Sequence, residues 1–317
     1  MDEAIEMVLQ SCHTYDAESS FIRRFATREK ELPLPEHRDR LFPDGHRAGQ
    51  HPSGCLLGDD RQMNYFTGID IGSTASKVVV LSETEIEDRF VLPTGWSSRE
   101  TSSDIARRLA EGGHPVGEGM TVVSTGYGRA AVDYADKTVT EITCHGRGGW
   151  YLLGRDCTII DIGGQDTKVI TVEHGMPTSF LMNDKCSAGT GKFLEIMANR
   201  LGVDLPELFT LAESGTPLAI SSMCTVFAES EVISHIGAGE RREDIAAGVV
   251  DSVVCKVAGL CARHTMTGDA LLTGGLCEST YLVKQLSQKL KRPVLTDPMG
   301  RYAGALGAAL IARGKAR

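Results

Sequence analysis

The sequence of 317 residues lacks the features that direct a chain to a membrane or to nucleic acid. It has no continuous run of about 18 apolar residues, so no membrane-spanning helix is expected. Its formal net charge is −9, which argues against a nucleic-acid partner because phosphate binding needs clustered Lys and Arg. The first twenty residues are acidic and lack a basic segment followed by an apolar stretch, so we expect no secretory signal and a cytoplasmic location.

The nine cysteines also lack the spacing of a disulfide framework. No C-x-x-C pair occurs, and the residues are spread along the whole chain. For a chain without an export signal, this distribution predicts reduced thiols, some of which can be metal ligands.

Residues 1–62 differ in composition from the rest of the chain. They are rich in Pro, Gly, His and charged residues and show no sustained hydrophobic period, which predicts a loosely ordered extension. From Tyr65 onward, short β-rich runs alternate with helical patterns, which is typical of an α/β fold.

An internal repeat is the strongest pattern in this α/β region. "GIDIGSTASKVVV", beginning at residue 68, aligns without a gap on "IIDIGGQDTKVIT", beginning at residue 159. Asp70 falls on Asp161 and Lys77 on Lys168. Each copy reads as a strand, a tight polar turn and a second strand, so we predict two β-hairpins in two related halves, residues 63–157 and 158–300, that face each other across a cleft. The alternative is two unrelated hairpins.

The hairpin turns have the composition of a phosphate site. Glycines let backbone N–H groups approach phosphate oxygens, and the neighbouring hydroxyl and amide side chains add donors. Asp70 and Asp161 can face phosphate only through a cation, so they predict Mg²⁺. The expected phosphate-binding residues are Gly72, Ser73, Thr74, Gly163 and Gly164, and the expected catalytic residues are Asp70, Asp161 and Gln165.

A third element, "ALLTGGLCESTYLVKQL", reads as a strand, a turn at Gly274 and Gly275, and a helix, which suits the close approach of an adenosine. The three elements in this order resemble the ATPase domain shared by actin, the Hsp70 chaperones and sugar kinases. The resemblance implies two domains with duplicated mixed sheets and a bound ATP or ADP in the cleft. It also implies that the Gly- and Ala-rich helix in residues 301–317 returns to the first half.

Two cysteines stand in unusual surroundings. Cys186 precedes the small-residue turn "SAGTG" and a helical pattern, and Cys224 precedes another helical pattern that starts at Thr225. A thiol near a helix N-terminus is favoured as the thiolate. Two thiolates are too few for a 4Fe–4S cluster, which usually takes four, but a twofold homodimer would supply four from Cys186, Cys224 and their symmetry mates.

The segments "NDKCSAGTGKFLEIMANRLG" and "SSMCTVFAESEVISHI" resemble the activator proteins of 2-hydroxyacyl-CoA dehydratases, in the family that also holds the ATP-hydrolysing subunits of benzoyl-CoA reductases. "STGYGR", "EITCHGRG" and "DIGGQDTKVI" support the same resemblance. It implies a homodimer with one bridging 4Fe–4S cluster, reduced by a ferredoxin or flavodoxin. Such a dimer passes one electron to a dehydratase, or to a related acyl-CoA reductase component, in a step driven by ATP.

Two other functions fit the same fold. In one, the chain is an ATP-dependent small-molecule kinase whose cysteines are incidental; in the other, it is a nucleotide-dependent binding module. The remaining cysteines of the α/β region are expected to be packing residues. These are Cys144, Cys157, Cys255, Cys261 and Cys277.

Overall fold

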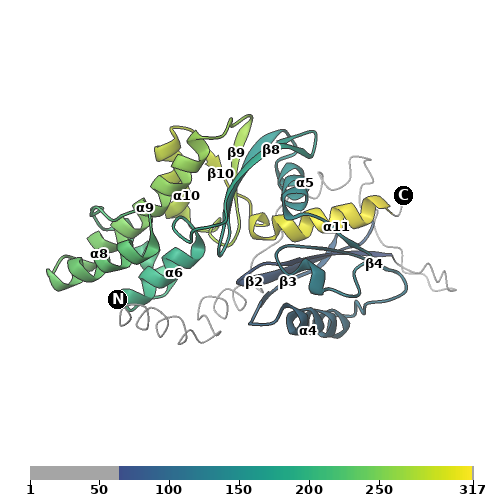
Figure 1. The fold of residues 1–317 in the computed structure, drawn as a ribbon. Coiled ribbons are helices and arrows are strands. Elements are labelled where there is room, and N and C mark those ends of the chain that lie inside the picture. The colour runs from purple at the N-terminus through teal and green to yellow at the C-terminus, as the bar shows by residue number, and fades with distance from the viewer. Residues whose placement is uncertain (1–63, 316–317) are drawn as a thin grey trace, which may run out of the picture.

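The computed structural model describes residues 64–315, so the extension predicted over residues 1–62 lies outside the described residues. Two five-stranded sheets form the framework, with strand orders β3-β2-β1-β4-β5 and β10-β9-β6-β7-β8 (Figure 1). The first sheet contains β1 (Tyr65–Ile71), β2 (Ala75–Leu81), β3 (Ile86–Pro93), β4 (Met120–Thr125) and β5 (Lys137–Thr138). The second contains β6 (Cys157–Ile162), β7 (Thr167–Glu173), β8 (Met176–Asn183), β9 (Asp269–Thr273) and β10 (Val294–Leu295).

The two sheets repeat the same strand register. Both predicted hairpins are present, with Asp70 opposite Lys77 in β1–β2 and Asp161 opposite Lys168 in β6–β7. In each half, the strand that carries the aspartate also pairs in parallel with a strand that ends in threonine. Asp70 of β1 lies opposite Thr125 of β4, and Asp161 of β6 lies opposite Thr273 of β9. The duplication therefore extends beyond the hairpins to a third strand of each sheet.

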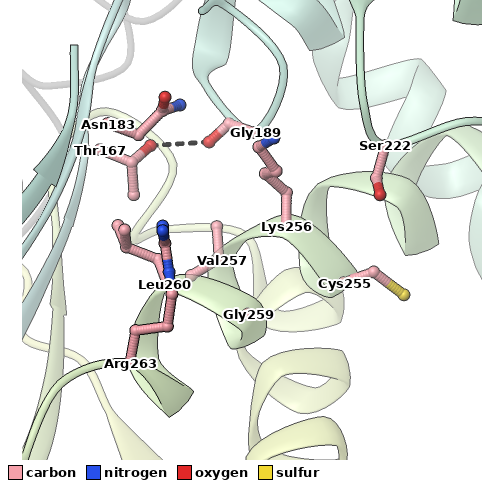
Figure 2. Close-up of a pocket in the computed structure, with 10 residues that line it drawn as sticks. All are labelled: Thr167, Asn183, Gly189, Ser222, Cys255, Lys256, Val257, Gly259, Leu260 and Arg263. Atoms are coloured by element: carbon pink, nitrogen blue, oxygen red, sulfur yellow. Dashed lines mark hydrogen bonds between the residues drawn. The ribbon is translucent and has the colours of Figure 1, made fainter. Parts of the chain in front are cut away.

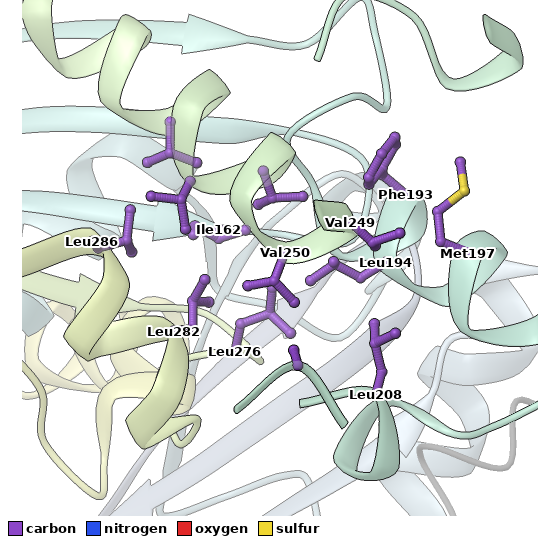
Figure 3. Close-up of a cluster of buried hydrophobic side chains, with 14 of the residues drawn as sticks. Ile162, Phe193, Leu194, Met197, Leu208, Val249, Val250, Leu276, Leu282 and Leu286 are labelled. Carbon is purple, nitrogen blue, oxygen red and sulfur yellow. The ribbon is translucent and has the colours of Figure 1, made fainter. Parts of the chain in front are cut away.

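Helices cover the sheets and form the layer between them. The helices are α4 (Ser98–Glu111), α5 (Glu141–Leu153), α6 (Gly191–Arg200), α7 (Leu205–Glu213), α8 (Thr225–Gly237), α9 (Arg242–Ala262), α10 (Thr280–Leu290) and α11 (Ala303–Lys315), with short 3-10 turns at Arg129–Ala131 and Gly300–Tyr302. The side chains of α6, α9 and α10 form one core with the second sheet (Figure 3). By length and composition α9 could cross a membrane, but 67% of its apolar window is buried inside the protein, as in the core helix of a soluble protein.

Two helices from distant parts of the sequence lie between the sheets. The C-terminal helix α11 packs on β1, β2 and β4 of the first sheet, whereas α5 packs on β6, β7 and β8 of the second (Figure 1). The two helices also pack against each other at glycines, and a Cβ on Gly307 of α11 would lie 1.8 Å from the Cys144 carbonyl oxygen of α5. The sheets are thus joined through a tight α5–α11 contact that admits only glycine at this point.

We predict that Gly307→Ala lowers the free energy of unfolding by about 1–3 kcal/mol, because the added methyl overpacks a backbone contact. Gly314→Ala is the matched control in the same helix, because a Cβ there meets nothing within 4 Å. The control should be neutral or stabilise by up to about 1 kcal/mol through helix propensity. Urea unfolding measures both variants, and equal midpoints would contradict the close α5–α11 contact.

Candidate functional site

The two hairpin turns lie against each other. A Cβ on Gly164 would stand 2.2 Å from Thr74 Oγ1 and 3.3 Å from Ser73 Oγ, so these parts of the two copies are in contact. Gln165 lies on the same second turn and is exposed. The structure therefore brings the predicted residues of both turns together at one place between the sheets.

The third predicted turn lies beside the second aspartate. Thr273 donates a hydrogen bond from its hydroxyl to Asp161 Oδ1 at 2.8 Å. Gly274 has a φ of +89°, and a Cβ there would lie 2.3 Å from the Ile162 carbonyl oxygen, so glycine is required by both conformation and space. A Cβ on Gly275 would meet nothing within 4 Å, so the backbone there is open to an approaching group.

The first half contains a counterpart of this turn. Gly126 follows β4 with a φ of +86°, and a Cβ there would lie 2.4 Å from Asp70 Oδ1. Thr125–Gly126 thus has the same position in the first half as Thr273–Gly274 in the second. Each aspartate is flanked by one Thr-Gly pair.

The buried imidazole of His145 on α5 lies between the two aspartates. Its Nδ1 is 3.4 Å from Asp161 Oδ1, and its Nε2 is 3.9 Å from Asp70 Oδ2. Glu141, one turn earlier in α5, places Oε1 3.8 Å from the same Nε2. Within residues 64–315, Glu141, His145 and Asp161 form a group of three side chains with the composition to hold a metal ion.

Lys168 provides a buried positive charge beside this group. Its side chain is 1% exposed, and its amine is 2.9 Å from Glu141 Oε1, 3.5 Å from Asp161 Oδ2 and 2.7 Å from Asp166 Oδ1. Burial alone would lower the pKa of Lys168, but these carboxylates raise it above its usual value. Burial would likewise raise the pKa of Asp161, yet His145, Lys168 and the Thr273 hydrogen bond lower it to about 2. Burial raises the pKa of Asp70, so the two equivalent aspartates differ electrostatically.

The cysteine segments form a second group of predicted residues. Cys224 is the N-cap residue of α8, as expected for a thiol at a helix N-terminus. Cys186 lies instead in the loop between β8 and α6, because a turn in which Thr190 donates to the Ser187 carbonyl oxygen precedes the helix. Asn183 holds this loop with amide hydrogen bonds to the carbonyl oxygens of Cys186 at 2.9 Å and Ala188 at 3.1 Å.

The two cysteine segments contact each other. The Cys186 thiol donates to the Met223 carbonyl oxygen at 3.7 Å, and Ser187 Oγ lies 2.7 Å from Thr225 Oγ1. Cys186 and Cys224 are both half-buried, so the thiols reach the surface.

The other cysteines within residues 64–315 follow the packing prediction with one exception. Cys144, Cys157, Cys261 and Cys277 are buried, and burial raises the pKa of their thiols to about 12, 12, 11 and 12. Cys255 is half-buried and lies within 3.4 Å of Asp251 Oδ2.

Direct backbone hydrogen bonds connect the second hairpin turn to the Cys186 loop. The first amides of α6 donate to the turn, from Gly191 to the Gly163 carbonyl oxygen and from Lys192 to that of Gly164, both at 2.9 Å. These bonds satisfy N–H groups that a helix start otherwise leaves unpaired. Thr167 adds a hydroxyl bond to the Gly189 carbonyl oxygen at 2.7 Å. A displacement of the turn must therefore move the start of α6 and the loop before it.

A sequence profile described as the BadF/BadG/BcrA/BcrD ATPase family matches residues 67–312. The chain belongs to this family. It is 44% identical over 256 residues to the (R)-2-hydroxyglutaryl-CoA dehydratase activating ATPase of Acidaminococcus fermentans, covering 80% of this chain and 98% of the relative. It is 29% identical over 262 residues to one of the subunits of the benzoyl-CoA reductase of Thauera aromatica, and the alignment covers 78% of this chain and 93% of that subunit.

A solved structure gives the same result for the fold. The activator of the 2-hydroxyisocaproyl-CoA dehydratase from Clostridium difficile with bound ADPNP superposes on the ATPase with a TM-score of 0.75 at 39% identity, covering 80% of this chain and 95% of that one. The predicted fold class of actin, Hsp70 and sugar-kinase-like ATPases is confirmed.

The sequence alone does not predict that the charged residues of α5 contact Asp161 of the second sheet. Glu141 and His145 stand four residues apart, a spacing that places both on one helix face, but their contact with Asp161 depends on how α5 crosses the second sheet. The alternation around Lys168 allows its side chain to face either solvent or a phosphate; it is instead buried among carboxylates.

We predict that Lys168→Met destabilises the ATPase by about 3–5 kcal/mol, because it leaves buried carboxylates without their cation. Lys284→Met on α10 is the control, because this lysine is exposed to solvent and its substitution removes the same charge. The control should change stability by less than about 1 kcal/mol. Urea unfolding followed by circular dichroism measures the difference, and equal losses in both variants would be inconsistent with the charge arrangement.

Proposed function

We propose that this protein is an ATP-dependent activator that donates one electron at a time to a 2-hydroxyacyl-CoA dehydratase. The main observation in support is that the start of α6, which follows the Cys186 loop, is hydrogen-bonded to the Gly163–Gly164 turn. This turn is part of the proposed nucleotide cleft. The relationship to the A. fermentans activator supports the dehydratase as partner. A cytoplasmic location fits a partner and a donor of this kind.

The nucleotide would occupy the region where the three turns meet. The Gly164 backbone amide with the hydroxyls of Ser73 and Thr74 would bind the phosphates. Gly72 and Gly163, whose own amides close the two turns, would leave room for the phosphates, and Gly274 and Gly275 would admit the adenosine. Asp70 and Asp161 would orient a hydrated Mg²⁺, and Gln165 would position water at the exposed end of the second turn. Because Thr74 lies against Gly164, a phosphate oxygen entering between the turns would part them.

The donor set at the cysteines fits a 4Fe–4S cluster shared by two subunits. Cys186 and Cys224 are half-buried, and their segments contact each other through the Cys186 thiol and through the hydroxyls of Ser187 and Thr225. One chain offers two thiolates, so a homodimer is needed to complete four ligands. When bound, such a cluster supplies the one-electron redox centre, for which a ferredoxin or flavodoxin is the proposed donor.

The surface of α8 supports the homodimer. Val226, Ile233 and Ile236 lie on one stripe of the helix and are 60%, 51% and 45% exposed, with Met223 and Phe227 at 78% and 66% beside Cys224. Apolar side chains gathered next to the cysteines are what a subunit or partner interface would cover.

We predict that the anaerobically reconstituted protein is brown and binds about four iron atoms per homodimer. Cys186→Ser and Cys224→Ser should each remove the colour and most of the iron while ATP binding persists. Cys255→Ser, which replaces a half-buried thiol that is not a proposed ligand, should keep both the colour and the iron. Iron analysis with electron paramagnetic resonance checks this, and an iron-free wild-type dimer after reconstitution would overturn the proposal.

We also expect the dithionite-reduced dimer to activate the dehydratase component that the A. fermentans relative serves, with ATP and not with ADP. This follows because ADP lacks the γ-phosphate, whose entry between the two turns would shift the second turn and with it the start of α6. Dehydration of (R)-2-hydroxyglutaryl-CoA is the measurement. Activation by ADP alone would argue against ATP coupling, and phosphorylation of a small acceptor in place of electron transfer would favour a kinase.

A role as one component of a benzoyl-CoA reductase is the second candidate, and its support is the 29% identity to the T. aromatica protein. The test is to reconstitute the T. aromatica reductase with this chain in place of its own subunit. ATP-dependent reduction of benzoyl-CoA, without activation of the dehydratase, would favour this second role.

A further inference from the structure

A cavity of about 490 Å³ lies between the edge of the second sheet and α9, beneath the Cys186 loop (Figure 2). Thr167 at the start of β7 and Asn183 at the end of β8 form one wall, and α9 with Arg263 just after it forms the other. Its volume falls in the range of small-molecule binding sites. The cavity is on the β8 edge of the sheet, opposite the β10 edge beside the proposed adenosine turn.

The lining of this cavity is positively charged. Figure 2 shows the Lys256 side chain extending from α9 to Gly189, and the Arg263 guanidinium reaching up toward Thr167 and Asn183. Within the described part of the chain, neither cation is paired with a carboxylate, and none of the described residues that line the cavity is acidic. Two cations converging on a cavity without a counterion favour an anion there.

The lining adds one neutral donor to these cations, the Ser222 hydroxyl, which faces the same space. The Asn183 amide nitrogen and the Thr167 hydroxyl donate instead to carbonyl oxygens of the Cys186 loop. The Lys256 stem packs on Gly189, whose φ is +87° and where a Cβ would lie 2.6 Å from the Lys256 Cγ. This contact holds the lysine against the loop, so its position is fixed by packing.

We propose that this cavity binds a small molecule through one or two oxyanion groups, either phosphate or carboxylate, held by Lys256 and Arg263. Guanidinium and ammonium groups bind such oxygens by charge-assisted hydrogen bonds. The lining includes none of the residues proposed above to bind ATP, and neither Cys186 nor Cys224.

Isothermal titration of the full-length chain with inorganic phosphate and with citrate tests the site. The protein is first saturated with Mg²⁺ and ADPNP, so that the phosphate-binding turns of the cleft are already occupied. We expect saturable binding of at least one probe, with one site per protomer. Phosphate binding alone indicates a phosphate-bearing ligand, and citrate binding alone indicates a carboxylate-bearing ligand; binding of neither would overturn the proposal.

The Lys256→Met, Arg263→Gln double variant should bind the probe at least about tenfold more weakly. Lys137→Gln with Lys284→Gln changes the net charge equally at two exposed lysines and should bind as the wild type does. If the first double variant fails to bind ADPNP, the exposed single variant Arg263→Gln replaces it with the same expectation. Equal probe affinity in the cavity variant and in the charge control would show that the cavity is not the site.

Discussion

The two hydrogen bonds from the start of α6 to the Gly163–Gly164 turn are the constraint on which the rest of the arrangement depends. A helix start must place its free N–H groups on some acceptor, and here the acceptors are carbonyl oxygens of the second hairpin turn. No side chain intervenes, so neither partner can move without the other. The same turn rests against Ser73 and Thr74 of the other half. One short stretch of backbone is therefore in contact with both halves and with the Cys186 segment.

The two halves have the same strand arrangement, but the charged residues at equivalent positions have different surroundings. Asp70 and Asp161 occupy equivalent positions, and each lies beside a Thr-Gly pair. Lys168 nevertheless sits in a buried cluster of carboxylates, whereas Lys77 donates to backbone. The difference arises because α5 carries Glu141 and His145 onto the second sheet, while the Gly- and Ala-rich α11 packs on the first. Equivalent residues are thereby given different environments by helices that are not equivalent.

Much of the fold and part of the candidate site could be predicted from the sequence. The hairpins follow from period-two alternation around polar turns, and the repeat fixes which residues are equivalent. The glycine turns and Cys224 at a helix start follow from local chemistry. The contact of His145 with both aspartates could not be predicted, because it depends on the crossing of α5 between the sheets. The position of Cys186 in a loop depends on a turn around Thr190 that the helical pattern after it does not show.

The packing of the Cys186 loop has a physical consequence for coupling. Cys186 packs against the core of the second sheet, and Ala188 of the same loop is fully buried in that core, so the loop is joined to the sheet by close contacts. Hydrogen bonds from Asn183 and Thr167 and the contact of Ser187 with Thr225 also hold the loop. The last of these joins the loop to the segment of Cys224, so the two thiols move as a connected pair. The packing of Ala188 and the bonds from Asn183 and Thr167 all join the loop to the second sheet, so a small shift of that sheet is passed on to the loop.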